Sequence, residues 1–157
     1  MPYLIDGHNL VPKLGLKLSD PEDESKLIER VLEFCQLEQT RADIYFDGAG
    51  PGQAERRSFG RVTAFFVRKN SSADEAIEGR LSKLGRDARN WRVVSSDQRV
   101  QASAREVHAQ VIPSDVFARL VEQAGARNAE KEEPAPELNQ KEVEDWLNLF
   151  KNRKKDL

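Results

Sequence analysis

The sequence predicts an α/β fold with a central, mostly parallel sheet of four to five strands and helices on both of its faces. Short apolar segments alternate with amphipathic segments along the chain, which is typical of repeated strand–helix–strand units. Acidic residues follow three of the apolar segments. The chain has 157 residues, which is enough for one hydrophobic core without a disulfide or a structural metal.

Five apolar segments have the composition of buried strands. They are residues 3–5, 42–46, 62–67, 91–94 and 107–112. The third of these has almost no polar alternation, so we expect it in the middle of the sheet rather than at an edge. Residues 48–60 contain four glycines and a proline, and we expect a mobile loop there.

Helix signals lie between these strands. Asp20 and Pro21 fit an N-cap and a first helical position, and apolar residues follow at helical spacing as far as Cys35. Ser72 and Glu75 fit a capping box at the start of a second helix. Further helices are expected at residues 98–104 and 114–123.

The C-terminal part of the chain has a different composition. We expect the folded domain to span residues 1–127, a polar, Pro-containing linker residues 128–138, and an amphipathic helix residues 139–157. The helix would carry an apolar stripe formed by Val143, Trp146, Leu147 and Phe150. This stripe either docks on the domain itself or binds a partner.

Composition limits the compartment and the partners. The single Cys35 excludes an internal disulfide and favours a reducing, cytoplasmic setting. No apolar run approaches the roughly 20 residues of a membrane span, and residues 1–9 do not resemble a signal peptide. Residues 56–105 hold twelve basic and five acidic residues, a net charge of +7. That excess suits either a phosphate-binding face or solvated helix faces.

Four aspartates are expected at one edge of the sheet. Asp6, Asp47 and Asp97 follow predicted strands, and Asp74 lies in the first turn of a predicted helix. Because the carboxyl ends of parallel strands share an edge, these carboxylates would meet there and suit a hard cation, Mg²⁺ or Mn²⁺. A zinc site is disfavoured, because there is one cysteine and the two histidines lack paired spacing.

Each aspartate also has a purely structural explanation. Asp6 and Asp47 each precede a glycine, as in ordinary turns. Asp74 would be favoured by the helix dipole alone, and Asp97 would serve as an N-cap.

Four neighbouring residues could support the aspartates. The Asn9 amide could hold a carboxylate or a water molecule, and the Ser95 hydroxyl could orient Asp97. Glu78 is either a further metal ligand or a surface acid. His8 either contacts substrate and transfers a proton or is simply solvated.

Five motifs, in order, resemble the NYN-domain nucleases, relatives of the PIN-domain nucleases, and most of all their YacP-like branch. They are DGHN (6–9), IYFDG (44–48), SSADEAIE (71–78), VVSSDQRVQ (93–101) and SARE (103–106). The segment EVEDWLNLF (142–150) also resembles a tail of this branch.

The resemblance implies a PIN-like three-layer sandwich with a C-terminal helix, and a metal-dependent RNA endonuclease. Its metal, Mg²⁺ or Mn²⁺, would be held by Asp6, Asp74 and Asp97. The other catalytic residues that the resemblance implies are Asp47, Asn9 and Ser95. The substrate could be messenger RNA or RNA at the ribosome.

The Arg-rich middle of the chain would then neutralise the RNA backbone. The predicted RNA-binding residues are Arg56, Arg57, Arg68, Lys69 and Arg99. The first two lie in the glycine-rich loop, which we expect to clamp the strand. Phe59 in the same loop either stacks on a base or anchors the loop in the core.

Two other functions stay open. One is a non-catalytic RNA- or ribosome-binding module that retains the nuclease fold. The other is a metal-dependent phosphohydrolase acting on small substrates. Phosphatases with an Asp nucleophile need a second Asp two residues later, where this chain has His8 after Asp6 and Ala49 after Asp47. The second function is therefore disfavoured.

Overall fold

A computed structural model describes residues 1–18, 22–49, 55–68 and 70–132 of the chain. Its six strands are β1 (Tyr3–Asp6), β2 (Ala42–Ala49), β3 (Arg56–Phe59), β4 (Val62–Arg68), β5 (Arg92–Val94) and β6 (Gln110–Ile112). They form one sheet in the order β3-β4-β2-β1-β5-β6. Only the β3–β4 pair is antiparallel among these described strands, so the expected mostly parallel sheet is confirmed.

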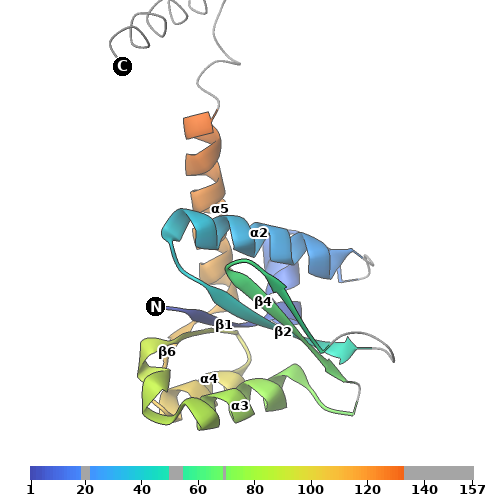
Figure 1. Cartoon of the computed structure of the whole chain (residues 1–157), viewed down its shortest axis with the longest axis vertical. Helices are drawn as coiled ribbons and strands as arrows, with labels where there is room; N and C mark the ends of the chain where they lie inside the picture. The colour runs from blue at the N-terminus through green and yellow to red at the C-terminus, as the bar shows by residue number, and fades with distance from the viewer. Residues whose placement is uncertain (19–21, 50–54, 69, 133–157) are drawn as a thin grey trace, which may run out of the picture. The chain divides into compact units, whose positions relative to one another are not determined.

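Helices cover both faces of the sheet (Figure 1). The helices are α1 (Gly7–Leu10), α2 (Asp23–Glu38), α3 (Ala73–Leu84), α4 (Gln98–Glu106) and α5 (Ser114–Glu132), with 3₁₀ turns η1 (Val11–Leu14) and η2 (Gly85–Asn90). Helices α2 and α5 pack with Ile5 and Ile44 on one face. Helices α3 and α4 pack with Leu4 and Tyr45 on the other. The alternation of neighbouring residues between two cores gives the predicted three layers.

Local sequence signals explain where two of the helices begin. The Ser72 hydroxyl accepts a hydrogen bond from the Glu75 amide at 3.2 Å, as expected for the capping box. Asp97 caps α4 by accepting from the amides of Arg99 and Val100 at 2.8 and 3.4 Å. Both helices therefore start at fixed points next to the carboxyl edge of the sheet.

The predicted loop at residues 48–60 is wrong for part of its length. Strand β2 continues to Ala49, and Arg56–Phe59 forms the edge strand β3. Gly60, with φ of 67°, and Arg61 link Phe59 to its partner Val62, so β3 and β4 form a tight hairpin. The glycines hid this strand, which raises the number of strands to six. The prediction that residues 62–67 avoid the edge is confirmed, because β4 lies between β3 and β2.

Two helical segments connect β1 to the rest of the fold without having been predicted. Helix α1 begins at Gly7 directly after β1, and η1 follows at once. A Cβ atom on Gly7 would lie 2.5 Å from the Phe46 ring, so the missing side chain lets α1 approach β2. The Asp6–Gly7 pair therefore opens a helix and is not a simple turn.

The chain has two compact units, residues 1–125 and 126–157. Helix α5 continues to Glu132, so the first five residues of the predicted linker at 128–138 are helical. The remaining linker residues and the predicted helix at 139–157 lie outside the described residues, as does the predicted helix start at Asp20 and Pro21. Helix α2 is described from Asp23, with Glu22 in the cap position.

Within the described part of the chain, no helix has the length and apolar character needed to span a bilayer.

Candidate active site

Four carboxylates gather where β1, β2 and β5 end. Asp6 is the last residue of β1, and Asp47 lies near the end of β2. Asp74 lies in the first turn of α3, and Asp97 is the N-cap of α4. Because β1 is parallel to both of its neighbours, the topology brings these carboxyl ends to one edge, where open α/β sheets bind ligands.

Asp6 has the most unusual environment of the four. Only 7% of the residue is exposed. Burial raises the pKa of Asp6 to about 6, and the negative charges of Asp74, Asp47 and Asp97 raise it further, whereas a hydrogen bond from Ser95 opposes the shift. In the folded protein, the charges of the other three aspartates therefore make ionised Asp6 less favourable.

Asp74 and Asp97 differ in how their charges are stabilised. The pKa of Asp74 is raised, first by burial and then by Asp97. Arg99 opposes that shift and also pairs with Glu78, its Nε lying 2.5 Å from Oε1. Asp97 instead accepts from backbone amides of α4, so the structural explanation for this residue holds. An N-cap carboxylate keeps further lone pairs for a ligand.

Ser95 and Asn9 fix the backbone around these acids. The fully buried Ser95 hydroxyl donates to Asp6 Oδ2 at 3.3 Å and accepts from the Asp97 amide at 3.0 Å. Asn9 Oδ1 accepts from the Ser96 amide at 2.8 Å and from the Ser114 hydroxyl at 2.5 Å. Ser95 therefore joins two acids, and Asn9 joins α1 to the segment before α4 and to the first residue of α5.

His8 is held between two carboxylates and is not simply solvated. Its Nε2 lies 2.9 Å from Glu24 Oε2, and its Nδ1 lies 2.7 Å from Asp47 Oδ1. The hydrogen bond to Glu24 is the main cause that raises the pKa of His8 to about 9. Burial opposes this shift, and the hydrogen bond to Asp47 adds to it. The ring is therefore a cation at neutral pH, and both of its nitrogens donate.

The predicted RNA-binding residues do not form one patch. Arg56 lies over the Phe65 ring and Arg57 over the Phe59 ring, on opposite faces of β3. Arg68 pairs with Glu55 at 3.2 Å. Among the five, Arg99 has its charge next to the acidic edge, through Glu78 and Asp74. Lys69 lies outside the described residues.

The donors present suit a hydrated divalent cation. Among the described residues, no three acidic, histidine or cysteine side chains form a ready-made ligand cage. The four aspartates nevertheless offer only oxygen, and burial together with the charges of the other three raises the pKa of Asp6. Mg²⁺ retains several of its waters and binds through one or two carboxylates, so separated carboxylates can hold it. His8 has no free lone pair for a metal while it is protonated.

Three residues of the site were missed in the sequence. Glu24, in the first turn of α2, hydrogen-bonds His8. Gln101 donates from Nε2 to the Ser95 carbonyl at 2.8 Å, and Ser114 holds Asn9. Gln101 belongs to the motif at residues 93–101, which was a usable signal. Glu24 lies in an acidic stretch that resembles an ordinary helix start, and nothing marked Ser114.

Comparisons with known proteins agree with the family resemblance and with the fold. A family model described as the YacP-like NYN domain matches residues 3–155. A crystal structure of Rae1 (YacP) from Bacillus subtilis is similar with a TM-score of 0.69 and 24% identity, covering 99% of this chain and 95% of that one. A crystal structure of a point mutant of that protein is similar with a TM-score of 0.65 and 24% identity, covering 85% of this chain and 86% of that one. No curated protein matches the sequence.

Proposed function

Because the chain belongs to the YacP-like NYN domain family, whose members are generally nucleases, we propose that it is a divalent-metal-dependent endoribonuclease. One observation carries the proposal. A buried carboxylate, Asp6, lies at the carboxyl edge of the sheet among three other aspartates whose charges disfavour its ionisation. Such an arrangement destabilises the free protein and becomes favourable when a cation binds.

Asp6, Asp74 and Asp97 would hold Mg²⁺ or Mn²⁺. When bound, the ion supplies stabilisation of negative charge on the scissile phosphate and activation of a water. Ser95 fixes the position of Asp6 by donating to Oδ2, and the first turn of α4 fixes Asp97. An in-line displacement at this edge would leave a 5′-phosphate and a 3′-hydroxyl.

Basic side chains would place the RNA backbone against the acidic edge. Arg99 is more than half exposed and keeps donors available beyond its pair with Glu78. Arg57 makes no ion pair among the described residues, so its charge is available to the RNA. The proposed substrate is single-stranded RNA, as messenger RNA or at the ribosome, and the proposed compartment is the cytoplasm.

The test compares the wild type with Asp6→Asn and with Asp87→Asn as a matched control, because Asp87 is an exposed aspartate of η2. Each protein is incubated with mixed single-stranded RNA in Mg²⁺, Mn²⁺ or EDTA, and the new ends are mapped. We expect metal-dependent cuts with 5′-phosphates from the wild type and the control, and a loss of at least about a hundredfold in Asp6→Asn.

Equal cutting by Asp6→Asn would reject the assigned site. RNA binding by all three proteins without cutting, also on translating ribosomes, would favour a non-catalytic binding module.

A further inference from the structure

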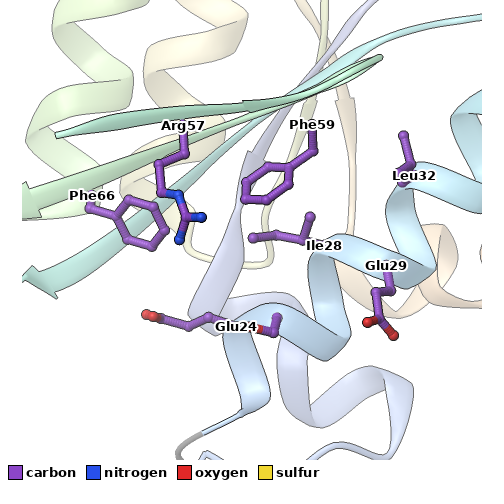
Figure 2. A pocket seen from close by; sticks show the side chains of 8 residues that line it. Glu24, Ile28, Glu29, Leu32, Arg57, Phe59 and Phe66 are labelled. Atoms are coloured by element: carbon purple, nitrogen blue, oxygen red, sulfur yellow. The ribbon is translucent and has the colours of Figure 1, made fainter. Parts of the chain in front are cut away.

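A cavity of about 360 Å³ lies between α2 and the β3–β4 hairpin (Figure 2). The residues that decide its chemistry are Glu24, Ile28, Leu32, Arg57, Phe59 and Phe66. Its volume falls within the range of about 300–1,000 Å³ that is usual for small-molecule sites. The sequence predicted no pocket here, because β3 was expected to be a loop.

The walls of the cavity are suited to a flat aromatic group. Phe59 on β3 is half-buried, and Phe66 on β4 stacks on Phe46 with ring centroids 5.6 Å apart. Arg57 lies two residues before Phe59 on the same face, with its guanidinium 5.3 Å from the ring centroid. Figure 2 shows Arg57 and Phe59 side by side, with Ile28 facing them from α2. Aromatic rings and guanidinium planes are the surfaces on which unpaired bases stack.

Two carboxylates, Glu24 and Glu29, and one guanidinium, Arg57, line the cavity. Glu24 and Arg57 both line it, and no ion pair joins them. Glu24 Oε2 accepts from His8, and within the described part of the chain Oε1 has no hydrogen bond. A ligand could therefore donate to the carboxylate and accept from the guanidinium.

The cavity is connected to the acidic edge by side chains. His8 joins Glu24 to Asp47, with contacts of 2.9 and 2.7 Å, and it lies two residues after Asp6. An RNA strand with a phosphate at the acidic edge can therefore place an adjacent base in the cavity.

We propose that this cavity is a nucleobase subsite that holds a guanine of the RNA next to the cleaved phosphate, an inference that rests on the proposed function. Guanine presents two neighbouring N–H groups, N1–H and N2–H, to a carboxylate such as Glu24. It presents acceptors O6 and N7 to an arginine such as Arg57. Its ring would stack against Phe59.

The first test measures binding in EDTA, where metal-dependent cleavage is absent. The probes are two fluorescein-labelled RNA decamers, one all adenosine and one with a single central guanosine, followed by fluorescence anisotropy. We expect the guanosine to strengthen binding to the wild type at least about fivefold, because hydrogen bonds to the base edge distinguish guanine from adenine, whereas stacking does not. Phe59→Leu and Arg57→Ala should remove that gain, and Arg86→Ala, an exposed arginine of η2, should keep it.

Phe59→Leu keeps an apolar side chain in the half-buried position, and circular dichroism verifies that each variant is folded. Equal affinity of the wild type for the two decamers would overturn the proposal. A preference of the same size in Phe59→Leu and Arg57→Ala would also overturn it.

The second test maps cuts in a random-sequence RNA with Mn²⁺. We expect guanosine at one fixed offset from the cuts made by the wild type and no such enrichment with Phe59→Leu. Cleavage without enrichment would reject the subsite and leave the nuclease proposal intact. Guanosine-dependent binding without any cleavage would support the subsite and reject the nuclease.

Discussion

At the scale of single residues, Asp6 combines burial with three like-charged neighbours. Its pKa is about 6 in the folded protein, whereas an ordinary exposed aspartate has a pKa of 3.8. Because the folded value is the higher one, ionised Asp6 destabilises the fold. The penalty is fully present above about pH 6 and disappears as the pH falls toward 3.8. A shift of this size corresponds to about 3 kcal/mol of unfolding free energy.

We therefore predict that Asp6→Asn stabilises the metal-free protein by about 1–3 kcal/mol at pH 7.5. The gain should shrink below about pH 6 and vanish below about pH 3, where Asp6 is protonated in both the folded and the unfolded state. Urea unfolding in EDTA at several pH values measures this difference.

The comparison variant is Asp87→Asn, which should change stability by no more than about 0.5 kcal/mol at any pH. A destabilised Asp6→Asn protein at pH 7.5 would contradict the electrostatic account of the site.

Helix caps and the shared edge of the four aspartates could be predicted, whereas individual side-chain contacts between distant elements could not. The caps at Ser72 and Asp97 follow from spacings of two or three residues, so the sequence displays them directly. The contact of His8 with Glu24 joins α1 to α2 across 16 residues and depends on how the two helices pack. No periodicity in the sequence encodes such a contact.

At the scale of elements, α1 shows how a missing side chain positions the site. It begins at Gly7, where an added Cβ would lie 2.5 and 2.6 Å from two ring carbons of Phe46 and 3.0 Å from Ile44. Phe46 is fully buried, so its ring has little room to move. The short distance between α1 and β2 places His8 and Asn9 beside Asp6.

We predict that Gly7→Ala destabilises the protein by about 1–3 kcal/mol through overpacking. Gly79→Ala is the matched control, because Gly79 is an exposed position in α3 with nothing within 4 Å of an added Cβ. It should stabilise the protein by up to about 1 kcal/mol through helix propensity. Thermal and urea unfolding measure both changes, and equal effects of the two substitutions would contradict the role assigned to Gly7.

The elements themselves were largely predictable because their apolar residues follow simple periods. The exception is β3, where the core-facing side chains are Arg57 and a half-buried Phe59 rather than aliphatic residues. An edge strand buries little surface, so its composition resembles that of a loop. The cavity beside β3 was hidden for the same reason.

At the scale of the whole molecule, the proposed metal site links ion binding to stability. An ion that binds only the folded state stabilises it by RT ln(1 + [L]/Kd), about 2.7 kcal/mol at a hundredfold excess over Kd. We predict that millimolar Mg²⁺ raises the Tm of the wild type by several degrees and that EDTA reverses the shift.

The rise in Tm caused by Mg²⁺ should be largely absent in Asp6→Asn and retained in Asp87→Asn. Calorimetric scans at constant ionic strength, with NaCl replacing MgCl₂, separate ion binding from general screening. Equal shifts in all three proteins would exclude Asp6 as a ligand.

Two of the hydrogen bonds that hold the site together join residues that are far apart in the sequence. Ser95 reaches Asp6 across 89 residues, and Ser114 reaches Asn9 across 105. The strand that carries Asp6 is made first, yet its neighbour β5 and the start of α5 emerge much later. A nascent chain that ends before Ser114 lacks the hydrogen bond that joins Asn9 of α1 to the start of α5. The hydrogen bonds of the acidic centre are therefore complete only after Ser114 has been synthesised.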